Sequence, residues 1–561
     1  MFTKWRLKAS QPGIEQVLVR ESGLSPLVAR LLVNRGITTP VQSVSFLKPS
    51  LQDLHDPFLF KDMAQAVARI RLARERAETV LVYGDYDVDG VTSTAVVSSL
   101  LNKLGIKVLR YIPHRMDEGY GLNHDIVPLA KEWGVKLLIT VDCGVTAVAE
   151  VEALRSVGID VIVTDHHEPE GQVPAAACAV INPRQPGCGY PFRDLAGVGL
   201  AAKLVQAVMG EFPRHDLDLV ALGTIADVVP LRGENRIIAR HGLPVIGNSS
   251  KAGMQALIEA ARVRGKVMTP HLVGFSLGPR LNAAGRMGSA STALELLLCD
   301  DPAVAASLVD VLEIHNRERQ RQQGAVVDEA VEIIEAEGDL PAHRIIVVHK
   351  DGWHKGVLGI AASRIVEKYG RPAFVISFEN GLGVGSARSV DGFHLNEALA
   401  SCAALLEGYG GHKRAAGLRV RQESVAALRE GLNLFAADVF GAGVPDSVLE
   451  IDSQITLPEV NMDLVAMLGD LEPFGEGNPA PVFATRRLMI KSRPQELGRG
   501  TLKLWVTDGR CSVSAVGFGM ADECRGLRMG QAVDIAFTLG IDDWNKAPVA
   551  QIMLKDIRPA K

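Results

Sequence analysis

Acidic and imidazole side chains follow strand-like segments of this sequence at the point where each segment ends. After the runs TVLVY, KLLITV and DVIVT come, in order, Asp85, Asp87 and Asp89, then Asp142, then Asp165, His166 and His167. The carboxyl ends of parallel strands meet at one rim of a sheet, and ligands bind there near the point where the strand order reverses. We therefore expect these side chains to converge on one site.

Taken singly, each of these residues has a plainer explanation. An aspartate in a turn is commonly a turn former or a helix cap, which would account for Asp85 and Asp89 beside Gly90. A histidine pair in a loop is commonly solvated. Together, however, five carboxylates with no lysine or arginine among them would repel one another strongly in a low-dielectric cleft. Divalent cations relieve such repulsion, and oxygen ligands with one or two imidazoles suit Mn²⁺ or Mg²⁺ better than structural zinc. The pattern predicts a metal site.

Phosphoester hydrolysis is the chemistry that such a site favours. Two metal ions that share a carboxylate can activate a water and stabilise the leaving oxygen of a phosphoester. Asp142, alone at the end of the middle strand, is the best candidate for the shared ligand. Asp227 is a further candidate, because a lone carboxylate in the apolar segment ALGTIADVVPL would be costly to bury. A structural salt bridge is the competing explanation, although that segment contains no lysine or arginine.

The elements that must position these residues alternate between short β-branched runs and amphipathic helices. Strands are expected at 79–83, 107–112, 136–141 and 160–164, with helices at 91–105, 124–134 and 146–158 between them. This alternation predicts right-handed βαβ units and a parallel sheet. A long polar helix is expected over 301–337, with Gly324 as a candidate break, and a second α/β region begins with RIIVVH at Arg344.

A chain of 561 residues is too long for one hydrophobic core, so we expect several domains. The fold class is α/β with a terminal barrel, and the parts are a helical lead (1–55), a parallel-sheet catalytic domain (56–300), a connecting helix (301–338), a second α/β domain (339–444) and a β-barrel of OB type (445–561). The barrel rests on five short strand-like runs in about a hundred residues.

Composition narrows the class of protein without deciding its function. The net charge of −5 gives no sign of nucleic-acid binding but does not exclude it, because basic groups can line a channel. The seven cysteines form no CxxC pair, which argues against a disulfide framework or a zinc ribbon and suits the cytoplasm. No apolar run approaches the roughly 18 residues of a membrane helix, the N-terminus lacks the apolar run of a secretory signal, and no GxxxxGK[ST] motif indicates an ATP-driven motor.

Four segments in succession, DYDVDG, TVDCG, TDHH and GTIADVVPL, resemble the motifs of the DHH phosphoesterases. Further segments are similar to the RecJ-like exonucleases of that family: GPRLNAAGRMG (278–288), GWHKGVLGIAASRI (352–365), PFGEGNPAPVF (473–483), GVGSARS and GGHKRAAG. The resemblance implies that the second α/β domain is of the DHHA1 type. It implies as metal ligands Asp87, Asp89, Asp142, His166 and Asp227, with Asp85 in or beside that set. It also places His167 against the scissile phosphate as a catalytic residue, with Asp142 and Asp85.

Other residues are candidates for holding the nucleic acid. The segment GLGVGSARS, in which we expect a glycine-rich turn, offers Ser386 and Arg388, and three further segments offer His412, Arg115 with Tyr120, and Arg280 with Arg286. Plainer alternatives remain: a simple glycine turn, packing for a lone tyrosine, and helix capping for Arg280 and Arg286. In the barrel the candidates are Arg499, Lys503 and Trp505, although Trp505 would suit the core equally well.

The function we expect is a 5′-to-3′ exonuclease on single-stranded DNA, acting in repair and recombination and releasing 5′-mononucleotides with one or two Mn²⁺ or Mg²⁺ ions. The polarity comes from the resemblance alone, as do a single-stranded-DNA-binding protein and a helicase as partners. One alternative is a DHH phosphodiesterase for short oligonucleotides or cyclic dinucleotides, which would not need the connecting helix and the barrel. Another is a catalytically inactive DNA-binding scaffold, which would have no reason to keep the mutually repulsive carboxylates.

Overall fold

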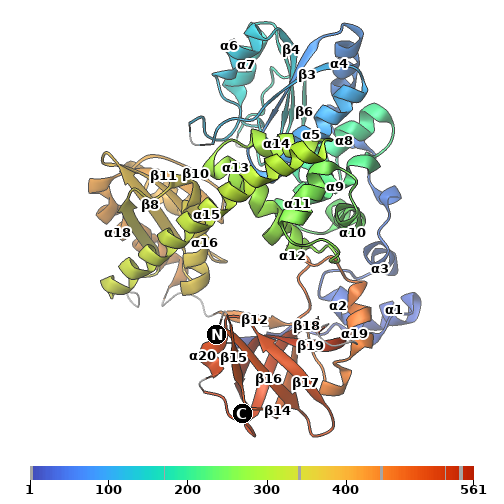
Figure 1. The fold of residues 1–561 in the computed structure, drawn as a ribbon, viewed down its shortest axis with the longest axis vertical. Helices are drawn as coiled ribbons and strands as arrows, with labels where there is room; N and C mark the ends of the chain where they lie inside the picture. Colours follow the sequence, from blue (N-terminus) through green and yellow to red (C-terminus); the bar gives the residue numbers. More distant parts are fainter. Residues whose placement is uncertain are drawn as a thin grey trace. The chain divides into compact units, whose positions relative to one another are not determined.

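Two compact units make up the chain in the computed structural model (Figure 1). The large unit consists of Asp56–Asp227 and Gly242–Pro445, and the barrel unit of Met1–His55, Val228–His241 and Asp446–Lys561. The structure describes residues 4–115, 117–169, 171–338, 343–441, 447–498, 500–524, 526–542 and 548–560. Within these ranges no helix is both long enough and apolar enough to cross a membrane.

The first sheet of the large unit has five parallel strands in the order β3-β2-β4-β5-β6. Their bounds are β2 Thr79–Gly84, β3 Lys107–Tyr111, β4 Val135–Val141, β5 Asp160–Thr164 and β6 Ala179–Ile181. The chain passes from β2 to β3 on one side and then to β4 on the other, so the order reverses between β2 and β4. The four strands expected from the sequence are confirmed, whereas β6, only three residues long, was not expected.

Helices cover both faces of this sheet (Figure 1). On one face lie α6 Ile126–Glu132 and α7 Val148–Ser156; on the other lie α4 Met63–Glu75, α5 Val88–Lys103 and α8 Gly197–Met209. Helix α9 Leu217–Ala226 is mostly apolar, is buried along nearly its whole length and packs against α5 and α8, as expected of a helix with little solvent face. Its C-terminal cap is Asp227, which the fold therefore brings to the same rim.

A series of shorter helices connects the first sheet to a long helix. They are α10 Gly233–Gly247, α11 Ala252–Ala260, α12 Pro270–Leu272, the π-helical segment η4 Val273–Leu277, α13 Gly278–Met287 and α14 Ser291–Leu298. The long helix α15 Pro302–Glu337 has 36 residues and packs against α11, α13 and α14 as well as α16 and β7. The expected break at Gly324 is wrong, because one glycine costs a helix only about 1 kcal/mol and buried residues such as Leu312 and Val326 anchor α15 on both sides of it.

The second sheet of the large unit has the order β10-β11-β9-β8-β7. Its strands are β7 Ile346–Asp351, β8 Ala373–Glu379, β9 Leu382–Arg388, β10 Leu406–Gly411 and β11 Ala415–Arg421, with helices α16 Leu358–Tyr369, α17 Leu395–Ser401 and α18 Val425–Phe440. The turn expected in GLGVGSARS is wrong, because this segment forms the central strand β9. Its glycines face packed side chains: a Cβ on Gly383 would lie 2.6 Å from the Phe378 ring, and one on Gly385 2.8 Å from Leu418.

In the barrel unit all five strands expected from the sequence are confirmed. They are β14 Phe483–Ile490, β16 Thr501–Thr507, β17 Ser512–Gly517, β18 Ala532–Asp542 and β19 Val549–Pro559, and pairing of β14 with β16 closes the barrel. Smaller elements accompany them: β1 Lys4–Leu7, β12 Val448–Ile451, β13 Ser453–Gln454, β15 Gln495–Leu497, α3 Pro40–Leu47, α19 Met462–Gly469 and α20 Ala521–Cys524.

Helices of the N-terminal lead complete the core of the barrel unit. Leu18 of α1 Pro12–Ser22 and Leu31 of α2 Pro26–Val33 belong to the same buried cluster as Phe483 and Phe537 of the barrel. The sequence did not indicate this shared core, because its two halves lie at opposite ends of the chain. Deletion of either half would expose the other, so point substitutions are the cleaner test of what the barrel does.

Candidate metal centre and phosphate site

A cavity of about 330 Å³ lies at the carboxyl-terminal rim of the first sheet, where residues that follow β2, β3 and β5 line it. Among the residues that line it are eight that the sequence singled out: Asp85, Asp87, Asp89, Arg115, Tyr120, His167, Asp227 and Arg286. Asp142 and His166 adjoin them, with His166 Nε2 3.3 Å from Asp142 Oδ1 and 3.6 Å from Asp227 Oδ2. The expected convergence at one rim is thus present in the fold.

The loop after β2 turns directly into α5. Asp87 caps this helix, its Oδ1 accepting from the backbone N–H of Asp89 at 2.9 Å and of Gly90 at 3.1 Å. The helix therefore begins at Val88, earlier than expected, and Asp89 lies in its first turn. Residue 90 has to be glycine, because a Cβ there would collide with the backbone of Asp85.

The N-terminus of α8 holds Asp89 from the other side. The Asp89 carboxylate accepts hydrogen bonds from the N–H groups of Gly197 (2.6 Å) and Val198 (2.7 Å). Burial, and then the charge of Asp87, nevertheless raise the pKa of Asp89 to about 7. A Cβ on Gly197 would lie 2.6 Å from Asp142 Oδ1, so this glycine lets α8 approach two carboxylates at once. No local feature of the sequence pointed to Gly197.

Asp142 occupies the centre of the acidic group. Its φ of 63° lies in the left-handed region, which is uncommon for a residue other than glycine and persists where the surroundings fix it. Its N–H donates to Thr164 O at 3.0 Å, which ties it to the end of β5. Burial, followed by the charges of Asp89, Asp87, Asp227 and Asp85, raises the pKa of the Asp142 carboxyl well above its ordinary value.

The donor atoms fit divalent metal ions. Asp85 Oδ1, Asp142 Oδ1 and His166 Nε2 are buried and have no hydrogen-bond partner among the described residues. Burial, and then the neighbouring His167, lower the pKa of His166 to about 3, which leaves its imidazole neutral and able to act as a ligand. Ligand atoms within 4.8 Å of one another form three groups: Asp142, His166 and His167; Asp89, His166 and Asp227; Asp85, Asp87 and Asp142. Asp142 and His166 each belong to two of them, and of these two only the carboxylate of Asp142 has two oxygens with which to bridge a pair of ions.

Asp165 supports His167 rather than the acidic group. Its Oδ1 lies 2.7 Å from His167 Nδ1, and its carboxylate also accepts from the N–H groups of Val145 (2.9 Å) and His167 (3.0 Å). Burial alone would lower the pKa of His167, but the bond to Asp165 prevails and raises it. Asp165 therefore favours the protonated form of His167, and the Tyr120 hydroxyl lies 3.1 Å from His167 Nδ1. This role of Asp165 was not expected from the sequence, although the Asp-x-His spacing is a usable signal for it.

Three arginines gather beside the acidic cavity. Arg286 Nη1 donates to Gly356 O at 3.0 Å, Arg115 lies over the Tyr86 ring at 4.7 Å, and Arg388 Nη1 donates to Ser386 Oγ at 3.3 Å. None of the three forms an ion pair within the described residues. Burial, and then the charge of Arg115, lower the pKa of both Arg286 and Arg388. Guanidinium groups that lie close together without an acidic partner can bind an anion.

A helix N-terminus adjoins this arginine group. A Cβ on Gly359, in the first turn of α16, would lie 2.9 Å from Arg388 Nη2 and 3.0 Å from Ser386 Oγ. The start of a helix presents free N–H groups and a partial positive charge. Ser386, Arg388 and the beginning of α16 therefore provide a hydroxyl, a guanidinium and backbone donors in one place.

Not every sequence candidate reaches the cavity. Arg280 forms an ion pair with Glu313 of α15 and donates to Ser276 O at 2.6 Å, so it joins two helices instead of lining the cavity. His412 is exposed in the turn between β10 and β11. By contrast Asn282, which the sequence analysis passed over, lines the cavity and accepts the Val88 N–H at 3.1 Å.

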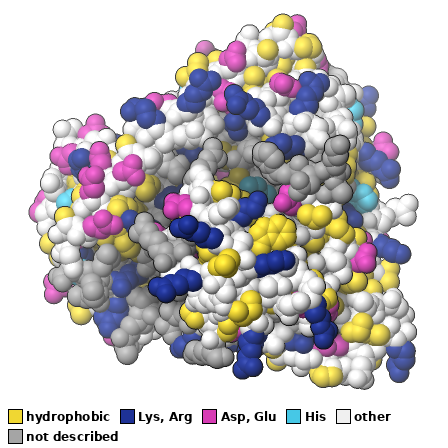
Figure 2. Space-filling view, turned by 60° about the horizontal axis from the view of Figure 1, so that its bottom comes forward, with side chains coloured by type: hydrophobic (Ala, Val, Ile, Leu, Met, Phe, Trp, Pro, Cys, Tyr) yellow, Lys and Arg dark blue, Asp and Glu magenta, His cyan; other side chains and the backbone are white. Residues whose placement is uncertain are grey.

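The barrel candidates lie in the other unit. Trp505 is 44% exposed, so its side chain is not part of the barrel core, and Lys503 precedes it on β16. Figure 2 turns the lower end of Figure 1 toward the viewer and shows lysine and arginine side chains interspersed with hydrophobic ones on that face. Arg499 lies outside the described residues.

Comparison with known proteins agrees with this architecture. The sequence matches the DHH family, N-terminal domain, over residues 79–224, the DHHA1 domain over 342–438, and the RecJ OB domain over 451–556. The single-stranded-DNA-specific exonuclease RecJ of Bacillus subtilis is 39% identical over 99% of this chain and 71% of that protein. RecJ of Escherichia coli is 32% identical over 99% of this chain and its own full length.

A solved structure extends the likeness to three dimensions. RecJ of Thermus thermophilus, crystallised in complex with Mn²⁺, superposes with a TM-score of 0.85 at 32% identity, covering 100% of this chain and 80% of that one. The same protein crystallised in complex with Mg²⁺ gives a TM-score of 0.79. With both sequence and fold alike over the whole length, the chain belongs to the RecJ family of DHH phosphoesterases.

Proposed function

We propose that this chain is a metal-dependent exonuclease that degrades single-stranded DNA from its 5′ end and releases 5′-mononucleotides. The observation that carries the proposal is the close placement of two unlike sites, an acidic group with unsatisfied buried ligand atoms and a group of unpaired arginines. An acidic site alone suits many metal enzymes. An acidic site beside an anion site suits cleavage at a fixed distance from a phosphate that marks the end of a strand.

The metal ligands in this proposal are Asp85, Asp87, Asp89, Asp142, His166 and Asp227. Bound Mn²⁺ or Mg²⁺ would polarise the scissile phosphate and lower the pKa of water at the site. His167 is the residue that we assign to the phosphate, because the hydrogen bond to Asp165 raises its pKa and it lines the cavity. A fixed cation there donates to a non-bridging oxygen and stabilises the charge that develops as the ester bond breaks.

The 5′ phosphate in this proposal binds Ser386, Arg388 and the first turn of α16. A terminal phosphate carries more negative charge than an internal diester, so a crowded arginine group favours a strand end over an internal position. Arg115 and Arg286 lie between this group and the metal ligands and would hold the intervening phosphate. The arrangement accounts for removal of one nucleotide at a time. Arg280 and His412 are left without a role at the cleavage site.

In this proposal the barrel binds the single-stranded DNA and takes no part in hydrolysis. Exposed Trp505 offers a face on which a base can stack, and Lys503 beside it offers a charge to the backbone. An enzyme limited to very short oligonucleotides or cyclic dinucleotides would not need such a grip. In a cell, we propose that the protein works in the cytoplasm, where a helicase supplies single strands and a single-stranded-DNA-binding protein presents them.

Labelled strands test the proposal directly. A 5′-labelled linear single strand should release its label at once as a mononucleotide in the presence of Mn²⁺, whereas a 3′-labelled strand should shorten progressively before its label appears as a mononucleotide. A circular single strand of the same sequence should survive, because it has no end to bind. Degradation of the circle at the rate of the linear strand would refute an exonuclease, and early release of the 3′ label would refute the polarity.

A further inference from the structure

The helical segment α12, η4 and α13 leads from the cavity to the surface. Asn282 and Arg286 are four residues apart in α13, His271 and Phe275 are four residues apart at the start of the segment, and the wider π-helical turn of η4 joins the two pairs. Asn282 and Arg286 line the cavity, and a Cβ on Gly278 would lie 3.6 Å from Ala226, which also lines it.

The opposite side of the same segment is apolar and buried. Val273, Leu277, Leu281 and Ala284 are fully buried or nearly so, and they fix the segment against the rest of the large unit. The rotational position of the helical segment is therefore set by its core face. The face that carries Phe275 is held outward by the same packing.

Phe275 and His271 form an exposed aromatic pair at the outer end of this face. The Phe275 side chain is 71% exposed, and its ring stacks on the His271 imidazole with centroids 4.7 Å apart and an angle of 25° between the planes. An exposed phenylalanine gains little from folding, since its apolar area stays in water. A flat ring supported from behind by a second ring is instead a surface on which a base can stack.

The polarity of the proposed function decides which part of the substrate would reach this pair. The C-terminal end of α13 contacts the second sheet domain through Arg286 and Gly356, beside the proposed 5′-phosphate site. The N-terminal end of the segment therefore leads toward the 3′ side of the strand. The seven residues from Asn282 back to Phe275 correspond to about 10 Å of helix, or roughly three stacked nucleotides.

We propose that Phe275, backed by His271, is a positioning residue that stacks on a base of the single strand two to four nucleotides to the 3′ side of the scissile bond. This inference rests on the proposed function and its polarity. Exposed Lys266 lies in the loop that leads into α12 and forms no ion pair within the described residues, so it is available to the strand backbone nearby. Because stacking needs an unpaired base, the contact would favour single strands over duplexes at the approach to the metals.

Fluorescence of 2-aminopurine tests the contact without any cleavage. The probe base is placed at each of the first eight positions of a 5′-phosphorylated single strand, and binding is measured in EDTA. Stacking quenches this fluorophore, so we expect quenching beyond that of free DNA at one or two neighbouring positions on the 3′ side of the first nucleotide. F275A should remove the quenching at those positions, F275W should keep it, and F275L should remove it, because leucine is apolar but not flat.

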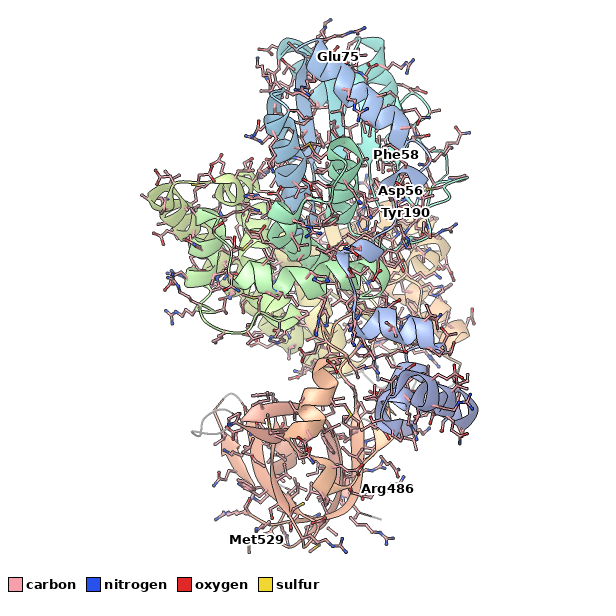
Figure 3. All side chains as sticks on the ribbon, turned by 90° about the vertical axis from the view of Figure 1, so that its right-hand side faces the viewer. Asp56, Phe58, Glu75, Tyr190, Arg486 and Met529 are labelled. Carbon is pink, nitrogen blue, oxygen red and sulfur yellow. The ribbon has the colours of Figure 1, made fainter. Side chains whose placement is uncertain are left out.

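Steady-state kinetics supply the second readout. Loss of one stacked base raises KM roughly 5- to 150-fold, whereas kcat should stay within about twofold, because Phe275 does not touch the reacting atoms. A substrate with an abasic site at the quenched position should bind the wild-type protein as weakly as the intact strand binds F275A, and F275A should lose nothing further on it. The matched control is F58A, which removes a phenylalanine that is 51% exposed elsewhere in the large unit, beside Asp56 and Tyr190 in Figure 3.

The outcomes separate this inference from the function on which it rests. Failure of the wild-type protein to degrade single strands in the assay of the preceding section would overturn the proposed function. Normal degradation with an unchanged KM in F275A, no position-dependent quenching, or equal effects of F275A and F58A would overturn the stacking contact alone. A melting temperature within a few degrees of wild type in each variant shows that the fold is intact, and F275W keeps the test decisive where F275A is unstable.

Discussion

Substituting asparagine for Asp142 should make the metal-free protein more stable while abolishing its activity. The amide keeps the shape of the side chain but removes one charge from a buried acidic group that contains Asp85, Asp89 and Asp227. Folding must either protonate this carboxyl or keep its charge among like charges, and each unit by which its folded pKa exceeds the unfolded value costs about 1.4 kcal/mol. New unsatisfied amide groups offset about 1–3 kcal/mol of the gain. Metal-free D142N should therefore unfold at a higher temperature than metal-free wild type, because relief of the carboxyl exceeds the amide penalty.

The sign of the pH dependence follows from the raised pKa of Asp142. A carboxyl whose pKa is higher in the folded than in the unfolded chain binds more protons when folded, so its contribution to stability falls as pH rises from about 4 toward the folded value. Metal-free wild-type protein should thus lose more stability between pH 6 and pH 8 than D142N does. Asp89, with a pKa of about 7, adds to this loss in both proteins.

Thermal melting in EDTA and in Mn²⁺, at pH 6 and pH 8, measures these effects beside hydrolysis of a single strand. The control is D218N, which changes an equally buried aspartate, 2% exposed as Asp142 is, whose carboxylate accepts from Lys251 Nζ at 2.5 Å and Ser249 Oγ at 2.7 Å. D218N removes the shorter of two ion pairs of Lys251, whose Nζ also lies 3.1 Å from Asp216 Oδ1, and should melt lower. A D142N protein that melts below wild type in EDTA, still gains stability from Mn²⁺ as wild type does, or retains near-normal turnover would refute the shared-ligand assignment.

The remaining predictions concern the helix that closes the acidic group, the end site and the barrel. G197A puts a Cβ 2.6 Å from Asp142 Oδ1, so we expect weaker Mn²⁺ binding in a titration followed by activity; an unchanged midpoint would contradict the role given to this glycine. R388A removes a charged hydrogen bond worth about 1.5–3 kcal/mol and should weaken binding of 5′-phosphorylated ends roughly ten- to a hundredfold. Equal losses on 5′-hydroxyl ends would count against the end site. W505A should slow degradation of long strands and lower their affinity while sparing very short oligonucleotides, and the same fractional loss at every length would show that the barrel acts on the cleavage site.

The part of the fold that follows local periodicity could be predicted from the sequence. The strands of the first sheet and of the barrel have β-branched runs of ordinary length, and the rule that ligands gather at strand ends then brought Asp85, Asp142 and His166 together correctly. Strand β9 could not be predicted in this way, because its glycines resemble a turn until the neighbouring strands supply Phe378 and Leu418 to pack against them.

Features that depend on contacts between distant segments could not be predicted from the sequence. Gly197 and Asn282 act through backbone contacts with the loop and helix that follow β2, more than a hundred residues away along the chain. Arg280 was a candidate phosphate ligand because its local motif is rich in small residues, but its guanidinium forms an ion pair with Glu313 of α15. The shared core of the N-terminal lead and the barrel has no local signal at all.

Metal-dependent release of mononucleotides from single strands tests the central claim most directly. A 5′-labelled strand, alone or annealed to its complement with blunt ends, is incubated with the protein in Mn²⁺, Mg²⁺ or EDTA, and D142N serves as the inactive control. The acidic group and the end site together predict labelled 5′-mononucleotide from the single strand with either metal, none in EDTA or with D142N, and little from the blunt duplex. Release of the label in EDTA, or equal degradation of single strand and duplex, would contradict the account.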